Sequence, residues 1–433
     1  MKEKMGKTLL SKLSALVLAV ALCMGMITPA YADVVTGNEA NPAEAAITKV
    51  LQMPTGTAIP ATTFTFEFES LTVDGVAGTS TNMPAILDKT ISYDGSEALF
   101  AEGVIDDGTT KTAIKQTLNI LDGVTWPHAG VYEYSITETD ASVTGMTYSP
   151  AKYKLIVYVA NGTGDSLYVA AVGAELIIED TPGQIIDSEG KVDPEPGPGG
   201  TEVIGDYSQM IFTNTYVKKG DGDPTVYANQ VLNINKTVAG TYGDKTMYFD
   251  YTLTVTKTAF EPAGTTYKAF VVADVSGAPT VVTSTDNAAS GSIKTDATWG
   301  DYIEVVSGAP ITIKLKHGQA LAFNDLTVGA SYTAVETGKA DYIATAVVVE
   351  DSGTPDSLDA VTPGTNLSTG LRVIGENANS AAFTNTYKLI TPTGIIIDNL
   401  PFIMLALVAV GTLATYVLVK SRKRKALQNR ENS

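Results

Sequence analysis

The sequence Phe212-Thr213-Asn214-Thr215-Tyr216 occurs a second time, as Phe383-Thr384-Asn385-Thr386-Tyr387. β-Branched and aromatic residues dominate both copies, so each copy predicts a β-strand. Because side chains alternate between the two faces of a strand, Asn214 shares one face with two aromatic residues, and so does Asn385. A half-buried strand usually carries an apolar residue there, and a buried amide needs hydrogen-bond partners. The repeat therefore raises the question of what two core asparagines do.

A strand-like segment with a lysine among aliphatic residues precedes each copy. The two segments are Ile47-Thr48-Lys49-Val50-Leu51 and Ile234-Asn235-Lys236-Thr237-Val238. Alternation places each lysine on one face together with two aliphatic side chains. Because lysine is seldom fully buried, this pattern marks Lys49 and Lys236 as unusual core residues.

A third matching pair lies between the lysine and the asparagine of each half. Tyr134-Ser135-Ile136-Thr137-Glu138-Thr139 parallels Tyr332-Thr333-Ala334-Val335-Glu336-Thr337. Glu138 and Glu336 each share a strand face with a tyrosine and an aliphatic residue. The repeated order of Lys, Glu and Asn predicts two duplicated domains, each with three polar groups that face its core.

These three groups can react with one another when they are buried together. Burial disfavours the charged forms, which lowers the pKa of a lysine and raises the pKa of a glutamate. Neutral lysine is a nucleophile, and a protonated glutamate can polarise the asparagine carboxamide and shuttle protons. Folding supplies a high effective molarity. The product would be a Lys–Asn isopeptide bond with loss of ammonia. The alternative is a buried, hydrogen-bonded triad without a covalent bond, and the ordered repetition favours the bond.

The composition limits the function classes. The chain has 433 residues, which suggests two or three domains, and a formal net charge of −18. This acidity argues against nucleic acid as a partner. The only histidines are His128 and His317, so we expect neither a zinc site nor a histidine-based catalytic triad. Asp221-Gly222-Asp223 resembles part of a calcium loop, but the remaining ligand spacing is missing. The sequence predicts no metal site and no cofactor.

Residues 1–32 have the pattern of a secretory signal peptide. A lysine-rich start precedes the mostly apolar run Leu13–Met26, and Ala30-Tyr31-Ala32 is a small-x-small cleavage site. Cys23 is the only cysteine and would leave with this segment. An exported β protein without disulfides would benefit from another kind of cross-link.

The region between the termini predicts short strands and no long helical stripe, so the fold class is all-β, with two tandem β-sandwich domains. We expect the first domain over residues 33–217 and the second over residues 218–388. Residues 33–46 are expected to form a flexible lead-in. The Gly-, Pro- and acid-rich segment Gln184–Gly205 predicts a long exposed loop, and Thr283–Gly300 is also expected to be loop-like.

The tail, residues 389–433, carries a second strong pattern. Ile390-Thr391-Pro392-Thr393-Gly394 is followed by an apolar stretch that ends with Leu400–Val419 and then by a basic cluster, Lys420–Lys425. An apolar segment of this length can span a bilayer, and the basic cluster would stay on the cytoplasmic side. On its own, the pattern predicts a single-pass anchor.

Taken together, the chain resembles a Gram-positive backbone (major shaft) pilin of the streptococcal T-antigen type. The resemblance is carried by the Phe-Thr-Asn-Thr-Tyr strands, the run Leu232–Gly240 and the tail. It implies Ig-like, Cna B-type sandwich domains with pilin isopeptide linkages. The bonds would form autocatalytically, joining Lys49 to Asn214 with Glu138 as the catalytic residue, and Lys236 to Asn385 with Glu336. It implies a structural subunit rather than an enzyme with an external substrate.

The resemblance also implies how subunits are joined. The segment Ile390–Gly394 is similar to a sortase signal, although the usual pattern is Leu-Pro-x-Thr-Gly and here proline directly precedes threonine. Sortase would cut between Thr393 and Gly394 and link Thr393 to a lysine of the next identical subunit. In T-antigen-type pilins the acceptor lies shortly before the strand with the bonding asparagine, which points to Lys191. Lys218 and Lys219 are the alternatives.

The implied location is the cell surface, anchored to the wall, with sortase, identical subunits, minor tip or base pilins and peptidoglycan as partners. A monomeric wall-anchored adhesin built of the same domains is the first alternative function. An exported enzyme is the second, and the scarcity of histidine and cysteine argues against it.

Overall fold

The protein is described here by a computed structural model, which covers most of the chain between the predicted signal peptide and the C-terminal helix. The described residues are 34–97, 103–180, 190–197, 207–220, 222–226, 230–275, 278–360, 362–388 and 400–431. The predicted signal peptide, residues 1–32, and the predicted sortase motif, residues 390–394, lie outside the described residues.

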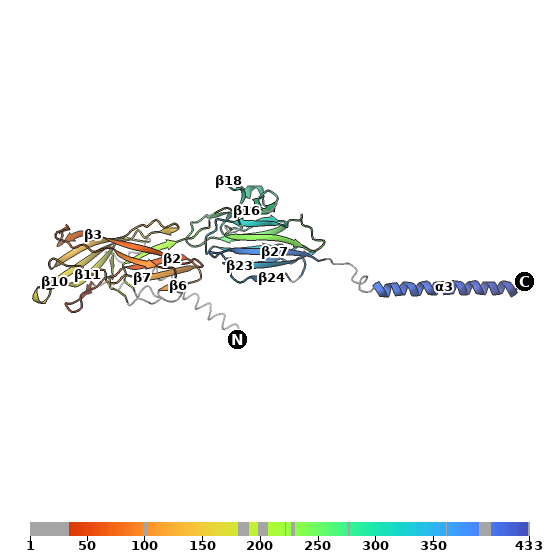
Figure 1. Cartoon of the computed structure of the whole chain (residues 1–433), viewed down its shortest axis with the longest axis horizontal. Coiled ribbons are helices and arrows are strands. Elements are labelled where there is room, and N and C mark those ends of the chain that lie inside the picture. The colour runs from red at the N-terminus through yellow and green to blue at the C-terminus, as the bar shows by residue number, and fades with distance from the viewer. Residues whose placement is uncertain are drawn as a thin grey trace.

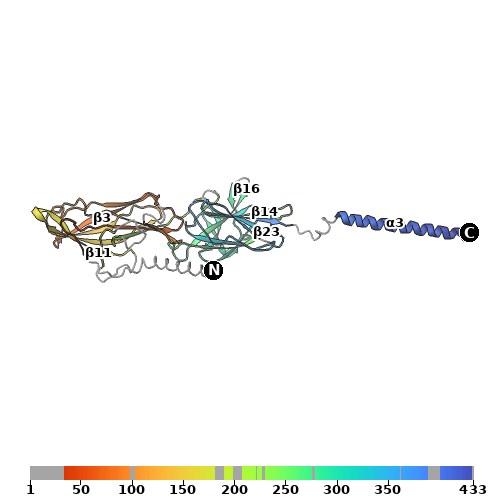
Figure 2. The ribbon, with the colours of Figure 1, turned by 90° about the horizontal axis from the view of Figure 1, so that it is seen from below.

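Two β domains lie end to end along the long axis of the molecule (Figures 1 and 2). Two sheets are built only from strands between residues 35 and 216, and two more only from strands between residues 232 and 387. The predicted all-β fold class is therefore confirmed. Alternating strands bury one face each between paired sheets, which is the arrangement of a β-sandwich.

The first domain has a larger and a smaller sheet. The larger sheet has the order β1-β11-β10-β8-β3-β4, with β12 paired to β11 and β5 to β3. Its strands are β1 (Val35–Thr36), β3 (Thr62–Val73), β4 (Val76–Ala77), β5 (Lys89–Tyr93), β8 (Gly130–Glu138), β10 (Lys152–Asn161), β11 (Leu167–Ile178) and β12 (Lys191–Val192). The smaller sheet has the order β6-β7-β2-β13-β9. Its strands are β2 (Thr48–Pro54), β6 (Val104–Asp106), β7 (Thr110–Gln116), β9 (Met146–Thr147) and β13 (Ile211–Tyr216).

The second domain also has a larger and a smaller sheet. Its larger sheet has the order β18-β19-β16-β21-β14-β27-β23-β24, with β17 paired to β16. The strands are β14 (Leu232–Ala239), β16 (Thr266–Val275), β17 (Ala278–Val281), β18 (Ile293–Asp296), β19 (Gly300–Val306), β21 (Gln319–Phe323), β23 (Tyr342–Val349), β24 (Asp356–Asp359) and β27 (Asn379–Tyr387). The smaller sheet, β20-β15-β22-β25 with β26 on β22, contains β15 (Phe249–Thr256), β20 (Ile311–Leu315), β22 (Ser331–Glu336), β25 (Leu367–Ser368) and β26 (Arg372–Val373).

A parallel pair of strands lies at the centre of each domain. In the first domain β2 runs parallel to β13, and in the second β14 runs parallel to β27. Strand β2 is buried on both faces, since Leu51 lies in the main core and Val50 packs in a separate cluster with Ile114 and Tyr207. Burial on both faces is typical of parallel strands. Because the repeated sequence motifs lie on these strands, their side chains are placed inside the domain.

The expectation of a flexible lead-in over residues 33–46 was wrong for the described part, which starts at residue 34. Strand β1 pairs with β11, and the Gly37 amide donates to Ala170 O at 2.8 Å. Ala43, Ala45 and Ala46 are buried against the first domain. Small side chains let this segment pack closely, which its polar composition did not indicate.

Two predicted loops are also more ordered than expected. Within Gln184–Gly205, residues 190–197 are described: β12 pairs with β11, and Val192 and Pro194 are buried. Within Thr283–Gly300, β18 pairs with β19 after a short 3-10 turn. In both cases the neighbouring strand supplies hydrogen bonds that override the loop-like local composition.

The two domains meet at a joint around Glu376. This carboxylate accepts a hydrogen bond from the Ala58 amide of the first domain at 2.8 Å, and it forms an ion pair with Lys218 at 2.8 Å. Gly329 of the second domain has φ +85°, and a Cβ there would lie 2.4 Å from Pro54 Cβ. Only glycine therefore allows this close approach between the domains.

Helix α3 (Leu400–Glu431) follows the second domain in the sequence. In the described part of the chain it contains one segment, Met404–Arg422, that is long and apolar enough to cross a membrane. The helix fits the single-pass segment predicted from Leu400–Val419 and the basic cluster after it.

Candidate functional site

The three predicted groups of the first domain meet in its core. Lys49 Nζ lies 2.8 Å from Glu138 Oε2 and also contacts Asn214 Oδ1. Asn214 Nδ2 donates to Glu138 Oε1 at 2.7 Å. Glu138 thus bridges the amine and the amide nitrogen, which closes a ring of hydrogen bonds among the three side chains.

The strand register explains why these residues meet. Across the parallel pair, Lys49 is opposite Phe212, and Asn214 is opposite Leu51, so the side chains of Lys49 and Asn214 are close neighbours on one face. Glu138 ends β8 in the facing sheet. The triad therefore joins the two sheets of the sandwich, and its partners come from positions far apart in the sequence.

Lys49 is fully buried, with an aromatic ring beside its amine. The side chains of Lys49 and Glu138 are both 0% exposed, and Lys49 Nζ lies 4.4 Å from the centre of the Phe64 ring. Burial lowers the pKa of Lys49 to about 8, although its attraction to Glu138 acts in the opposite direction. Burial also raises the pKa of Glu138. Both shifts favour a neutral amine beside a protonated acid.

The second domain assembles the same three residue types. Lys236 Nζ lies 3.0 Å and 2.9 Å from the two oxygens of Glu336 and contacts Asn385 Oδ1. The register is also the same, since Lys236 is opposite Phe383 and Asn385 is opposite Val238. Burial lowers the pKa of Lys236 to about 8, against the attraction of Glu336. The structure thus brings together all six residues that the sequence predicted, three in each domain.

The two triads differ in their hydrogen bonds. In the second domain the Tyr251 hydroxyl donates to Glu336 Oε2 at 3.0 Å. Asn385 Nδ2, although buried, has no hydrogen-bond partner among the described residues. Glu336 is therefore held by Lys236 and Tyr251 and does not reach the amide nitrogen, unlike Glu138 in the first domain.

Sequence comparison of the two halves missed two residues at the first site. The Ser149 amide donates to Asn214 Oδ1 at 2.9 Å, and the Ser149 hydroxyl donates to Asp180 Oδ1. Asp180 Oδ2 also accepts a hydrogen bond from the Thr213 amide at 2.7 Å. Neither residue belongs to a repeated motif, so the repeat that revealed the triads could not reveal them.

The geometry permits nucleophilic attack by an amine on a carboxamide. The lowered pKa of Lys49 makes its neutral, nucleophilic form more abundant at neutral pH than that of an ordinary lysine. The fold holds the amine and the carboxamide in contact, which would remove the entropy cost of bringing them together for such a reaction.

The predicted acceptor Lys191 lies on β12, at the edge of the larger sheet of the first domain. Its backbone pairs with that of Glu175 on β11, and its side chain is exposed. The structure therefore places Lys191 on an edge strand rather than in an open loop.

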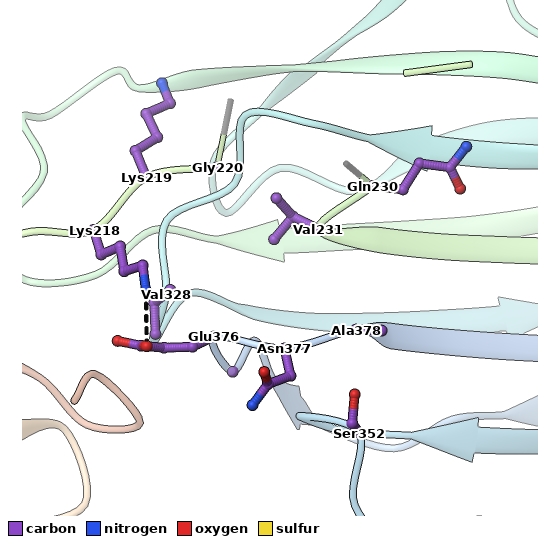
Figure 3. Close-up of a pocket in the computed structure, with 11 residues that line it drawn as sticks. Lys218, Lys219, Gly220, Gln230, Val231, Val328, Ser352, Glu376, Asn377 and Ala378 are labelled. Carbon is purple, nitrogen blue, oxygen red and sulfur yellow. Dashed lines mark hydrogen bonds and ion pairs between the residues drawn. The ribbon is translucent and has the colours of Figure 1, made fainter. Parts of the chain in front are cut away.

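The alternative acceptors line a cavity of about 370 Å³ at the domain joint (Figure 3). Lys218 points to Glu376 and forms an ion pair with it, while the Lys219 side chain extends away from Glu376. The Lys219 backbone bridges to Thr327 of the second domain. Both lysines thus belong to the joint between the domains.

Comparison with known families identifies the class of the first domain. Residues 45–217 match the Spy0128-like isopeptide containing domain, and this range includes Lys49, Glu138 and Asn214. Residues 230–387 match a domain of unknown function, DUF7601. The first match confirms, for residues 45–217, the resemblance to a pilin isopeptide domain that the sequence indicates.

Solved pilin structures are similar to the chain over most of its length. The major pilin from Streptococcus pyogenes is 20% identical, with a TM-score of 0.32, and the match covers 80% of this chain and 99% of that chain. The T-13 major pilin of the same organism is 21% identical, with a TM-score of 0.29, covering 82% and 100%. No curated protein matches the chain.

Proposed function

We propose that the chain is the repeating shaft subunit of a cell-surface pilus, with an internal Lys–Asn isopeptide bond in each domain and with subunits joined by sortase. The observation that carries this proposal is the buried Lys–Glu–Asn triad in both domains, with each lysine amine against the asparagine carboxamide. A stiff chain of covalently closed domains suits a shaft that must bear tension.

The bond in the first domain would form in one balanced exchange. The Lys49 Nζ lone pair attacks Asn214 Cγ, a new C–N bond forms, and the bond from Cγ to Nδ2 breaks. Glu138 contacts both nitrogens, so it can take a proton from Nζ and deliver it to Nδ2. The amide nitrogen leaves as ammonia, and Glu138 ends in the protonation state in which it began.

The bond in the second domain would join Lys236 to Asn385 by the same exchange, with Glu336 as the proton carrier. Glu336 must shift from its present contacts toward Asn385 Nδ2 before it can protonate the leaving nitrogen. The Lys236 amine already lies 4.0 Å from the centre of the Phe249 ring, in surroundings that disfavour its charge. The reaction is intramolecular, so the protein needs no external substrate.

Assembly would use the tail and an exposed lysine. Helix α3 holds the subunit at the membrane while sortase cleaves between Thr393 and Gly394, and the resulting Thr393 carbonyl is passed to a lysine of the next subunit. Other identical subunits, minor tip or base pilins and finally peptidoglycan would then be its covalent partners at the cell surface.

A ladder of covalent multimers would distinguish a pilin from a monomeric wall-anchored adhesin. Cell-wall extracts should be sedimented and then separated under denaturing conditions. The proposal expects a regular series of bands that contain this chain, whereas an adhesin gives only wall-attached monomer. A single monomer band in cells that contain the cognate sortase would overturn the shaft assignment.

Substitution Lys191→Arg is expected to abolish this ladder while wall-attached monomer remains. Arginine keeps the charge of Lys191 but offers no amine that sortase can use, and the exposed side chain on an edge strand tolerates the change. The matched controls are Lys218→Arg and Lys219→Arg, which should leave the ladder intact. If Lys191→Arg leaves the ladder unchanged and one of the controls removes it, the acceptor is at the domain joint.

A further inference from the structure

We propose that Ser149 and Asp180 form an oxyanion-stabilising device in the first domain, which accelerates formation of the Lys49–Asn214 bond. In this assignment the Ser149 main-chain N–H stabilises the charge that develops on Asn214 Oδ1, and Asp180 is a positioning residue that fixes both Ser149 and the strand that carries Asn214. The inference rests on the proposed isopeptide chemistry and adds groups outside the Lys–Glu–Asn triad.

The first observation is the donor on the reacting carbonyl. The Ser149 amide lies 2.9 Å from Asn214 Oδ1, in a buried part of the core. When Lys49 Nζ attacks Asn214 Cγ, electrons move onto Oδ1, which becomes an oxyanion in the tetrahedral intermediate. Lys49 then bonds to the carbon and its donor geometry to Oδ1 is lost, so the Ser149 N–H is the fixed donor that remains. Preorganised donors of this kind supply a large share of the rate enhancement in many enzymes.

The second observation is the way in which Asp180 braces this donor. One carboxylate oxygen accepts from the Ser149 hydroxyl, and the other accepts from the Thr213 amide at 2.7 Å. Thr213 precedes Asn214 on β13, so a single carboxylate ties the Ser149 side chain to the backbone of the strand that carries Asn214. The Ser149 hydroxyl also accepts from the Ala151 amide at 3.1 Å, which further fixes this turn.

The consequence is an oriented carboxamide. With Oδ1 held by Ser149 and Nδ2 held by Glu138, rotation of the Asn214 amide would break both hydrogen bonds, so the carboxamide is kept against the Lys49 amine. A displacement of about 1 Å in such a site costs roughly 10²-fold in rate, so the residues that prevent it have a measurable role.

The second domain lacks this arrangement among its described residues. The donor found on Asn385 Oδ1 is Lys236, and Asn385 Nδ2 has no partner there. The two sites occupy one molecule and use the same three residue types, so the second site is an internal control for any change made near the first.

The test follows the loss of ammonia from each domain with time. The full chain is synthesised in a cell-free system, samples are quenched at intervals, and the cross-linked peptides of the two domains are quantified by mass spectrometry. Asp180→Ala and Ser149→Ala should slow formation of the first bond by roughly 10²-fold, whereas the second bond should form at the wild-type rate. Ser149→Thr, which keeps the hydroxyl that Asp180 accepts, should restore most of the rate.

A matched control separates positioning from simple destabilisation. Asp325 is a half-buried carboxylate of the second domain that accepts from the Lys268 amide at 3.2 Å, and Asp325→Ala should change neither rate. Each variant is also combined with Lys49→Ala, and the unfolding midpoint of the first domain is measured without any first bond.

The possible results are distinct. Slow first-bond formation with an unchanged midpoint supports the positioning role. An unchanged first-bond rate, slowing of both bonds together, or slowing that only accompanies a lowered midpoint overturns it. If the wild-type chain loses no ammonia from either domain, the isopeptide chemistry itself fails, which is a different outcome from failure of the Asp180 assignment.

Discussion

The folded protein, freed of residues 1–32, is expected to weigh less than its sequence by two molecules of ammonia. Each triad places a lysine amine with a lowered pKa against a buried asparagine carboxamide, so each domain should lose one ammonia when it folds. Intact-mass measurement on purified protein gives the total, and peptide mapping locates the branched Lys–Asn peptides.

Single substitutions should divide this loss between the domains. Lys49→Ala or Glu138→Ala should restore one ammonia, and Lys236→Ala or Glu336→Ala should restore the other. Lys154 is a matched control, because it is a surface lysine that forms an ion pair with Glu175 at 2.6 Å, and Lys154→Ala should leave both losses in place. A wild-type mass equal to that of the unmodified sequence would show that the triads are hydrogen-bonded without a covalent bond.

Removing one bond is expected to lower the free energy of unfolding of its domain by roughly 5 kcal/mol, by the chain-entropy estimate used for disulfides. The bonds would close loops that span 165 and 149 positions. Glu138→Gln is the best variant for this measurement, because it keeps the side-chain volume, Lys49 and Asn214 while it removes the proton carrier. Denaturant unfolding, monitored separately for the two domains, gives the difference from wild type.

The other variants of this site should be less stable than Glu138→Gln for a separate reason. Lys49→Ala also removes a long, fully buried side chain and leaves a cavity in the core, which adds about 2–5 kcal/mol of destabilisation. Since the only cysteine is Cys23, reducing agents should have no effect on the mature protein. If Glu138→Gln unfolds at the wild-type denaturant concentration although its bond is absent, the bond does not stabilise the domain.

The sequence predicted the triads because polar residues interrupted the apolar faces of strands at the same places in both halves. Lys49, Glu138 and Asn214 could be aligned with Lys236, Glu336 and Asn385 without knowledge of the sheet order, and burial confirms all six as core residues. Strand alternation is a local property, so it can be read from a single segment.

The groups that the sequence did not predict depend on contacts between distant segments. Asp180 accepts hydrogen bonds from Ser149 and Thr213, which are far from it in the sequence. No local sequence pattern marks Ser149 or Asp180 as part of the site. The buried alanines of residues 43–46 and the pairing of β18 depend in the same way on the strand beside them. The difference between the two triads, in which Tyr251 holds Glu336, arises from the cross-strand pairing of these two residues.

The parallel pairing of β2 with β13, and of β14 with β27, has a consequence for survival outside the cell. A bond between such strands turns each domain into a ring, with the chain entering and leaving near the same side chains. A protease that cuts once anywhere between Lys49 and Asn214, for instance at an exposed turn, opens the ring but leaves the subunit in one covalent piece. A second cut in the same ring would release only the segment between the two cuts, because the bond still joins Lys49 to Asn214. A filament of such subunits would therefore tolerate isolated nicks without breaking.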